Sequence, residues 1–298
     1  MLAIIAPGQG SQSPGMLSAW LKDSTLRDTC AAWSLEIGID LLTLGTSADA
    51  EEIKDTANAQ PLIVAAGLLS FKALGVTPSV VSGHSVGEIT AASLATIISE
   101  TDAMRIVTAR GFEMAKAAAI TPAGMSAVLG GDREVVLKAI SDLGLVAAND
   151  NGGGQIVAAG NLDALAQLAP EGARVRALAV AGAFHTRYMH PAVATLDQFA
   201  KDLESKDPEV KLWTNSTGQL LSSGRLFIDQ MVNQVSNPVR WDLCMDSMLS
   251  AGITAIIELS PAGTLVGLAK RAMPGVETVA VKTPENIEAA LSLINNHQ

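Results

Sequence analysis

The sequence predicts an α/β protein in which helices cover a parallel β-sheet and a small mixed unit is inserted into the larger one. The chain has 298 residues, enough for a large domain with a sizeable core and a smaller domain set into it. Nearly half of the residues are apolar but only 3% are aromatic, and Ala, Leu, Val and Ile are spread along the chain. This composition is typical of a parallel sheet covered by helices. Short apolar segments also alternate with helical patterns, as expected for this class.

The first part of the chain favours two strands, each followed by helical sequence. We expect, in order, a strand, a helix, a strand and an Ala-rich helix at residues 2–6, 59–74, 79–82 and 86–98. Pro61 falls in the first turn of the helix at 59–74, where its missing N–H costs little, and Gly75 ends that helix. The strand at 79–82 and the helix at 86–98 leave only a tight turn between them.

A compact series of short elements from about residue 124 predicts the inserted unit. We expect strands at residues 125–129, 145–149, 155–159 and 173–180, and helices at residues 132–143 and 161–168. The resulting order, β-α-β-β-α-β, is the split pattern of ferredoxin-like units. We therefore expect a large domain formed by residues 1–120 and 184–298, and a ferredoxin-like subdomain formed by residues 121–183.

After the inserted unit the alternation of helix and strand resumes. We expect helices at residues 191–203 and 240–251, a turn at 215–218, a late apolar strand at 253–259 and a further helix after Gly263. No internal repeat or low-complexity tract interrupts this pattern. The last third of the chain is therefore expected to complete the large domain.

The charge and the cysteines exclude several classes of function. A formal net charge of −10 argues against binding to nucleic acid and to anionic membrane surfaces. Cys30 and Cys244 match no metal or redox spacing, so we expect ordinary thiols of a reducing cytosol, with no metal and no cofactor. The apolar start lacks a basic leader, and no apolar run reaches bilayer length without polar interruption. We expect a cytoplasmic, soluble protein, and nothing indicates more than a monomer.

The turn at residues 83–87, Gly-His-Ser-Val-Gly, fits the Gly-x-Ser-x-Gly nucleophile elbow. Small residues let a strand turn sharply into a helix and leave the serine exposed at the helix N-terminus. There the helix dipole and free amides favour developing negative charge. The alternative is a glycine-bounded loop that contains a serine by chance, but the strand before it and the helix after it favour Ser85 as a nucleophile.

A serine nucleophile needs a base, and the chain offers four histidines. His84 adjoins Ser85, so we expect it to point elsewhere, into packing, and we expect His297 to be disordered near the chain end. His185 and His190 remain. His185 directly follows the last strand of the inserted unit, where a loop returns to the large domain, and such loops often carry catalytic groups. Spacing alone favours His185 only modestly over His190.

Two further residues have a functional and an ordinary interpretation. The backbone N–H of Gln9, in a glycine-flanked turn after the first strand, would form an oxyanion hole together with the amide of Val86. On these residues alone, an ordinary polar turn is the better interpretation. Arg110 lies on a helix, where a surface charge is the usual role of an arginine.

Five motifs together resemble the family of malonyl-CoA:acyl carrier protein transacylases. They occur in the order and approximate spacing of that family, at residues 7–12, 83–88, Arg110-Gly111 with Met114, 182–185 and 237–241. The resemblance covers essentially the whole chain, as far as the turn at residues 260–263. It implies an α/β-hydrolase-like large domain with a ferredoxin-like insert, in agreement with the pattern above.

The resemblance also implies roles for single residues. Ser85 would be the acylated nucleophile and His185 its general base, oriented by the backbone carbonyl of Gln234 in place of a carboxylate. The oxyanion hole would use the amides of Gln9 and Val86. Many members of the family have Leu at the position of Val86, a change that leaves the backbone N–H in place.

Three residues would bind the acyl group. Arg110 would hold the free carboxylate of a malonyl group, because a guanidinium forms two parallel charge-assisted hydrogen bonds with a carboxylate. An acetyl group would leave this cation unpaired. Phe184 resembles the version of this loop associated with malonyl rather than methylmalonyl groups, and Met114 belongs to the same implied substrate site.

The implied reaction is ping-pong transfer of malonyl from malonyl-CoA, through a malonyl-serine ester, to the phosphopantetheine thiol of an acyl carrier protein for fatty acid synthesis. Carrier proteins of this kind are usually acidic, so a basic patch at the site mouth is expected, with Lys270 and Arg271 as candidates. The alternatives are a free-standing transacylase of the polyketide-synthase or malonate-decarboxylase type, and a serine hydrolase. An inactive docking module is a further alternative, but it needs no nucleophile, base and cation together.

Overall fold

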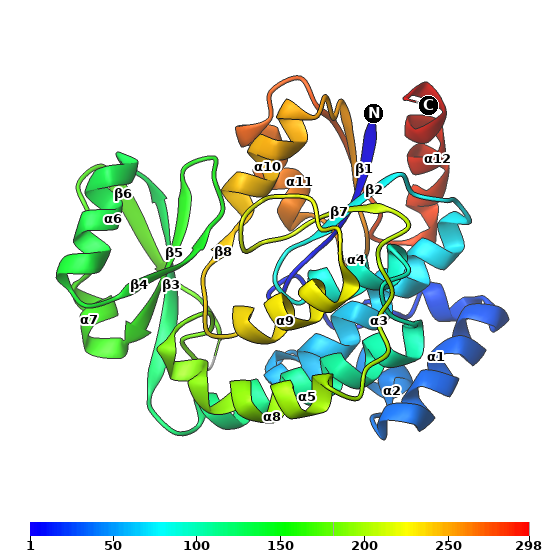
Figure 1. Cartoon of the computed structure of the whole chain (residues 1–298), viewed down its shortest axis with the longest axis horizontal. Helices are drawn as coiled ribbons and strands as arrows, with labels where there is room; N and C mark the ends of the chain where they lie inside the picture. The colour runs from blue at the N-terminus through cyan, green and yellow to red at the C-terminus, as the bar shows by residue number, and fades with distance from the viewer. Residues whose placement is uncertain (181, 298) are drawn as a thin grey trace.

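The part of the chain that the structure describes, residues 1–180 and 182–297 of a computed structural model, contains two five-stranded sheets. The first has the order β10-β9-β1-β2-β7, and each neighbouring pair is parallel. Its strands are β1 (Leu2–Ala6), β2 (Val80–Gly83), β7 (Lys211–Trp213), β9 (Ala255–Glu258) and β10 (Glu277–Ala280). Figure 1 shows this sheet in the larger part of the molecule, with helices on both faces.

The helices of the larger part form two layers on this sheet. They are α1 (Ser24–Ile37), α2 (Leu41–Thr46), α3 (Thr56–Leu74), α4 (Gly87–Leu94), α5 (Glu100–Ala118), α8 (His190–Ala200), α9 (Gly224–Gln234), α10 (Trp241–Ser250), α11 (Thr264–Ala272) and α12 (Ile287–Asn296). Short 3-10 helices lie at Trp20–Lys22, Glu52–Lys54, Arg187–Met189 and Pro284–Asn286. Along β1 the side chains alternate between the layers: Ile4 joins the cluster that contains α3, whereas Ala3 and Ile5 pack with α10 and α11.

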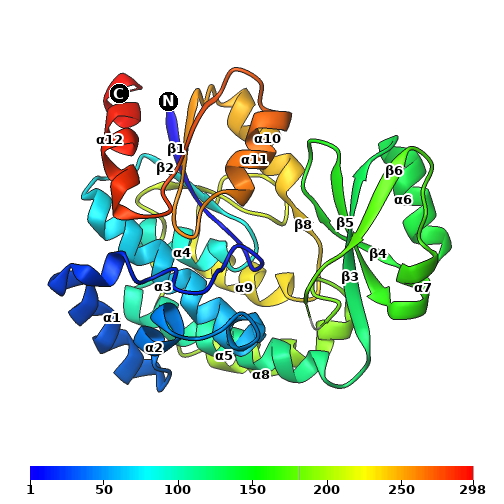
Figure 2. The same ribbon diagram turned by 180° about the vertical axis from the view of Figure 1, so that it is seen from behind.

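The second sheet has the order β6-β3-β5-β4-β8 and forms the core of the smaller part. Its strands are β3 (Ala123–Gly130), β4 (Val146–Asp150), β5 (Gln155–Asn161), β6 (Ala173–Ala177) and β8 (Val239–Arg240). The first four pair antiparallel, whereas β8, which comes from later in the chain, pairs parallel with β4. Helices α6 (Arg133–Asp142) and α7 (Leu162–Gln167) cover the outer face, away from the first sheet (Figures 1 and 2).

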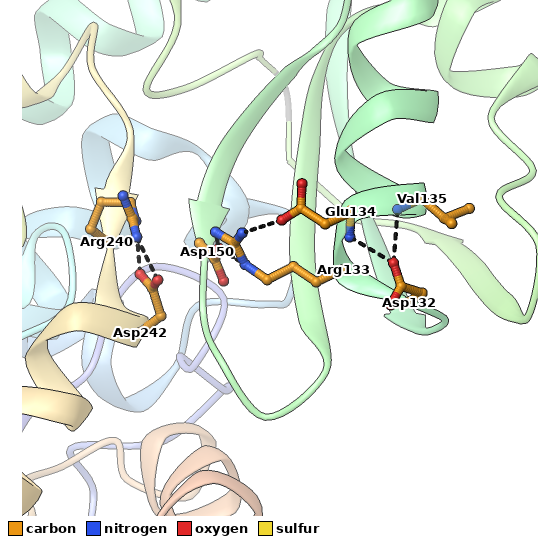
Figure 3. A network of polar contacts seen from close by, with 7 residues as sticks. All are labelled: Asp132, Arg133, Glu134, Val135, Asp150, Arg240 and Asp242. Carbon is orange, nitrogen blue, oxygen red and sulfur yellow. Dashed lines mark hydrogen bonds and ion pairs between the residues drawn. The ribbon is translucent and has the colours of Figure 1, made fainter.

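Charged pairs lie where β8 joins the smaller sheet (Figure 3). Arg133 of α6 binds Asp150 at 2.7 Å, and Arg240 binds Asp242 at the same distance. Asp150 lies directly opposite Arg240 in the register of β4 and β8. Asp132 caps α6 by accepting from the amides of its first turn. Pairs of opposite charge from the two parts of the molecule therefore meet at this joint.

The structure confirms the parallel sheet and the series of elements expected within residues 124–180, and it corrects several boundaries. Helix α3 begins at Thr56 because the Asp55 side chain accepts from the amide of Ala57, so Pro61 lies in the second turn rather than the first. Helix α4 ends at Leu94, four residues before the expected end. Strands β7, β8 and β10 were not foreseen.

Helix α3 is the one helix in the described residues that is long and apolar enough to cross a membrane by length and composition. In the fold, 72% of its most apolar window is buried. It packs against α5 and against α4, the helix that follows the serine turn. These contacts make α3 a core helix of the larger part.

Candidate active site

Ser85 lies in a strained turn between β2 and α4, as the Gly-x-Ser-x-Gly pattern predicts. Its φ of 52° is in the left-handed region, which costs a non-glycine residue about 1–3 kcal/mol. A Cβ on Gly83 would overlap the backbone of Gly87, and a Cβ on Gly87 would overlap the carbonyl of Ala6. Both glycines are therefore required for the close approach of β1, β2 and α4 that presents the serine.

The structure brings His185 to Ser85. Ser85 Oγ lies 2.8 Å from His185 Nε2, and His185 Nδ1 lies 2.8 Å from the carbonyl oxygen of Gln234. Because a carbonyl only accepts, Nδ1 carries the proton and leaves Nε2 free to accept from the serine hydroxyl. The His185 amide also donates to the carbonyl of Val235 at 3.0 Å, which fixes the backbone of the base.

The surroundings of His185 keep its imidazole neutral. Burial, and then the positive charge of Arg110, lower the pKa of His185 from 6.5 to about 3. A neutral imidazole is the form that accepts a proton from a nucleophile. The geometry therefore suits His185 as a base, and the lowered pKa keeps its Nε2 unprotonated while reducing its affinity for a proton.

Arg110 of α5 is fully buried beside the nucleophile. Its Nη1 donates to Gln60 Oε1 at 2.7 Å, and its Nη2 donates to Ser85 Oγ at 3.3 Å. Its Nε has no hydrogen-bond partner among the described residues. Burial lowers the pKa of Arg110 to about 10, whereas the nearby charge of Glu88 raises it. A buried cation with a free donor is a site for an anionic group.

Gln9 and Val86 lie on either side of the serine turn. The Gln9 side chain donates to Thr56 Oγ1 at 3.1 Å, which anchors the turn after β1. Val86 is the residue that precedes the first turn of α4. Within residues 1–180 and 182–297, the backbone amides of Gln9 and Val86 donate no hydrogen bond. Both amides are therefore free to bind an oxygen of a ligand.

A cleft of about 540 Å³ opens above the serine between the two parts of the molecule. The larger part lines it with Gln9, Gln60, Ser85, Met114, Phe184 and His185, and the smaller part with Met125, Ala127, Asn149, Asn151 and Val157. The inner face of the smaller sheet thus forms one wall. All the residues expected to bind the acyl group lie in or beside this cleft.

The other histidines lie away from the nucleophile's hydroxyl. His84 packs against Trp241 and its Nε2 lies 2.8 Å from Asn151 Oδ1, so it points away from Ser85 Oγ, but it also lines the cleft and is only partly buried, which the expectation of simple packing did not include. His190 is exposed at the start of α8. The expectation that His297 is disordered is wrong, because its ring bonds Thr254 Oγ1 at 2.9 Å.

The candidate basic residues Lys270 and Arg271 are exposed in the last turn of α11. Arg271 Nε donates to the carbonyl of Gly153 at 3.3 Å, so it contacts the smaller part. The first turns of α11 line the cleft through Thr264 and Leu265. The two cations therefore lie on an element of the cleft wall but are not among the residues that line it.

Sequence reasoning missed four polar residues at the site. Gln60 holds Arg110, Lys54 lines the cleft, and Asn215 and Glu88 lie beneath the serine turn. Glu88 was visible only as the end of a motif, and Asn215 only as part of an expected turn. The position of a Gln beside Pro61 in an otherwise apolar run was the signal that the sequence offered for Gln60.

Comparison with known proteins agrees with this geometry. A family model described as an acyl transferase domain matches residues 4–286. The malonyl CoA-acyl carrier protein transacylase of Mycobacterium tuberculosis is 49% identical, over 98% of this chain and 100% of the relative. The Bacillus subtilis protein of the same name is 33% identical, over 98% of this chain and 97% of the relative.

Solved structures agree as well. The crystal structure of MCAT from Mycobacterium tuberculosis superposes with a TM-score of 0.94 at 50% identity, covering 97% of this chain and 99% of that one. The malonyl-transacylase PlMCAT in complex with AntF, a type II PKS acyl-carrier protein, superposes with a TM-score of 0.91 at 28% identity, over 99% of each chain.

The fold and the serine site together define an acyl transferase, the class that the matched model describes. Within that class, the chain belongs to the family of malonyl CoA-acyl carrier protein transacylases.

Proposed function

We propose that the chain is an acyl-carrier-protein S-malonyltransferase that moves malonyl from malonyl-CoA to the phosphopantetheine thiol of an acyl carrier protein and so supplies fatty acid synthesis. One observation carries the proposal. The Ser85–His185–Gln234 hydrogen-bond chain, with 2.8 Å at each step, lies beside a buried guanidinium 3.3 Å from the serine hydroxyl. A nucleophile beside a fixed cation suits an acyl group that carries its own carboxylate.

In the first half-reaction Ser85 Oγ transfers its proton to His185 Nε2 and attacks the thioester carbonyl of malonyl-CoA. The tetrahedral intermediate collapses, the carbon–sulfur bond breaks, and the leaving thiolate of CoA takes the proton from His185. In the second half-reaction the carrier thiol gives its proton to His185 and attacks the malonyl-serine ester. Ser85 leaves and recovers that proton.

The oxyanion of both intermediates would bind to the amides of Gln9 and Val86. The free state of these two N–H groups supports this assignment, because a donor without a partner is available to a developing negative charge. Val86 also lies at the N-terminus of α4, where the helix dipole favours such a charge.

Arg110, Phe184 and Met114 would select the acyl group. The unpaired Nε of Arg110 and its Nη2 both offer hydrogen bonds to a malonyl carboxylate. Phe184 is buried and lines the cleft, so its ring restricts the space beside the α-carbon of the acyl group. Met114 is held by Gln60, whose Nε2 lies 3.4 Å from its sulfur.

We propose the following domain organisation. The α/β-hydrolase-like catalytic domain would comprise residues 1–120 and 184–298, and the ferredoxin-like subdomain residues 121–183. The strand order β6-β3-β5-β4, with helices after β3 and β5, supports the ferredoxin-like assignment. The pairing of β8 with β4 would tie the two domains together.

The protein is further proposed to act as a monomer in the cytoplasm, without nucleic acid or membrane partners. The net charge of −10 and two buried free thiols, Cys30 and Cys244, support this setting. Lys270 and Arg271 remain the proposed contacts for an acidic carrier protein, because they are exposed on the helix that borders the cleft.

A polyketide carrier protein is the second candidate acceptor. The similarity to the malonyl-transacylase solved with a type II PKS acyl-carrier protein favours it over a malonate-decarboxylase partner. A serine hydrolase is less well supported, because His185 is oriented by a carbonyl rather than by a carboxylate. Transfer rates to fatty acid and polyketide carrier proteins, measured from the same malonyl-enzyme, separate the two acceptors.

Labelling with radioactive malonyl-CoA tests the proposal. Ser85→Ala is expected to incorporate no label, and His185→Ala to acylate more slowly by about 100-fold or more. His190→Ala is the matched control, because His190 is exposed at the start of α8, and it should label like the wild type. Stoichiometric labelling of Ser85→Ala would overturn the proposal.

A further inference from the structure

We propose that Asn215 is a positioning residue that holds the turn of Ser85 in its reactive conformation. This inference rests on the proposed role of Ser85 as the acylated nucleophile. Asn215 lies in the turn that follows β7, and its side chain reaches the backbone on both sides of the nucleophile. It touches neither the cleft nor the reacting atoms, so it acts through Ser85.

The side-chain amide of Asn215 bridges the two arms of the serine turn. Its Oδ1 accepts from the Ser85 N–H at 2.7 Å, and its Nδ2 donates to the carbonyl of Gly83 at 2.6 Å. One arm needs an acceptor and the other a donor, and a primary amide supplies both from adjacent atoms. Asn215 is completely buried, so water does not compete for either bond. A single side chain therefore bridges the two arms of the left-handed turn.

The sheet register places Asn215 at this point. β7 pairs parallel with β2, and Trp213 lies opposite Ser82. Since parallel strands end at the same edge of a sheet, the residues just after Trp213 lie beside the turn that follows Ser82. Strand β7 therefore brings a distant part of the chain to the nucleophile.

Asn215 is itself fixed by two other elements. Its N–H donates to Glu88 Oε1 at 2.7 Å, and its carbonyl accepts from the Arg240 amide at 2.8 Å. The side chains of Thr214 and Gln234 also act on the Glu88 carboxylate, where they lower its pKa against the effect of burial. Because the carbonyl of Gln234 orients His185, the same buried cluster fixes the nucleophile and the partner of its base.

Loss of this amide would release the strained turn. Ser85 holds a φ of 52°, a conformation that persists only where surrounding bonds determine it. Relaxation would move Oγ away from His185 Nε2, and a displacement of about 1 Å in a catalytic group lowers the rate by roughly 100-fold. Arg110 would lose its contact with Ser85 Oγ but keep its bond to Gln60, which does not involve Asn215.

The first test compares Asn215→Ala with Ser216→Ala, an exposed neighbour in the same turn. For Asn215→Ala we expect kcat for malonyl transfer to fall by about 100-fold and KM for malonyl-CoA to change by less than about twofold. Phosphonylation of Ser85 by a fluorophosphonate, in which Oγ displaces fluoride and gives its proton to His185, should slow equally. Ser216→Ala should match the wild type in both assays.

The second test uses the charge of an isosteric variant. In Asn215→Asp the introduced carboxylate accepts from Ser85 but repels the carbonyl of Gly83, whereas its protonated form restores the donor. Ionisable groups around the position are Glu88 of α4, Arg110 of α5, and Cys244 and Asp242 of α10. The rate of phosphonylation of Asn215→Asp, divided by the wild-type rate at the same pH, should therefore rise about tenfold as the pH falls from about 8.5 to about 6. The same rise is expected in a Glu88→Gln background, since Glu88 no longer titrates there.

The outcomes separate this inference from the proposed function. Near-UV circular dichroism identifies folded variants. Asn215→Ser, whose shorter side chain offers one hydroxyl in place of the amide, replaces any variant that fails to fold and should show an intermediate loss. A folded Asn215→Ala or Asn215→Ser that is phosphonylated at the wild-type rate and has the wild-type kcat would overturn the inference. A ratio of phosphonylation rates for Asn215→Asp that does not change with pH would overturn it as well. Wild-type enzyme that reacts with the fluorophosphonate at Ser85, but forms no malonyl adduct, would overturn the proposed function and leave the role of Asn215 standing.

Discussion

At the scale of single residues, the buried guanidinium of Arg110 sets the chemistry of the cleft. It lies beside the nucleophile and lowers the pKa of His185, after burial itself, so it helps keep the base neutral. It also offers an unpaired Nε to an anionic substrate. In the proposed function, one side chain would therefore act both on acyl selection and on the protonation state of the base.

Arg110→Ala should lose malonyl selectivity. We expect kcat/KM for malonyl-CoA to fall by about 100-fold or more, because a buried charge-assisted pair with the carboxylate is lost. Reaction with acetyl-CoA should fall less, so the ratio of the two kcat/KM values measures the effect. Lys116→Ala, an exposed cation on the same helix, is the control. An unchanged ratio in Arg110→Ala would contradict the account.

The residues that the sequence predicted are those whose role follows from a local pattern. The serine turn is recognisable in the sequence by two glycines at fixed positions, Gly83 and Gly87, and the structure shows why each is needed. The pairing of His185 with Ser85 depends on tertiary contacts 100 residues apart, so spacing could not decide between His185 and His190. Asn215 and Gln60 act through bonds that only the folded structure creates; no local pattern marks Asn215, and a polar residue in an apolar helix is the only mark of Gln60.

At the scale of elements, the serine turn depends on the close packing of β1, β2 and α4. Long buried elements such as β1 and α3 were predicted from their apolar runs. The missed strands are short or lie at edges: β8 has 2 residues, β7 has 3, and β10 is an only partly buried edge strand. In such segments pairing with a neighbour, rather than an apolar pattern, decides the structure.

Gly87→Ala should disable the site through this packing. Its Cβ would overlap the carbonyl of Ala6, so β1 and α4 must separate, at a cost of about 1–3 kcal/mol in the free energy of unfolding. Acylation of Ser85 should fall by about 100-fold or more. Gly267→Ala on α11 is the matched helical control, because nothing lies within 4 Å of the added Cβ. Equal effects of the two substitutions on urea unfolding and on acylation would contradict the packing argument.

At the scale of the whole molecule, the cleft exists because two sheets from different parts of the chain face each other. The sequence predicted the correct order of the elements of the small unit, but it did not predict that β8, from later in the chain, pairs with β4 of its sheet. That pairing joins residues far apart in sequence, and two ion pairs, one on each side of the joint, lie beside it. The buried carboxyl of Glu88 lies in the first turn of α4 and accepts from the Asn215 N–H, so its ionisation connects the site to the stability of the fold.

Stability should depend on pH through Glu88. Burial raises the pKa of Glu88 from 4.5 to about 7 in the folded chain. Below pH 4.5 the group is protonated in both states, and as the pH rises the unfolded chain ionises first, so this contribution to stability is lost between pH 4.5 and about 7. Glu88→Gln should therefore become more stable than the wild type as the pH rises, by on the order of 3 kcal/mol across the window. Urea unfolding from pH 4 to pH 8 measures the difference.

The matched control for this comparison is Glu209→Gln, which removes an exposed carboxylate. His185 titrates in the same way in each of these chains, so its effect cancels in the differences. If the difference in free energy of unfolding between Glu88→Gln and the wild type stays constant across the pH range, the raised pKa of Glu88 is contradicted.

The central claim is that Ser85 carries a malonyl group from one thiol to another. The most direct measurement is intact mass spectrometry of the enzyme after one equivalent of malonyl-CoA, with peptide mapping of the adduct and its decay in buffer or with carrier protein. The account predicts a malonyl-sized adduct on Ser85 that the phosphopantetheine thiol removes far faster than water does. An adduct at another residue, or one that water removes as fast as the carrier protein, would contradict it.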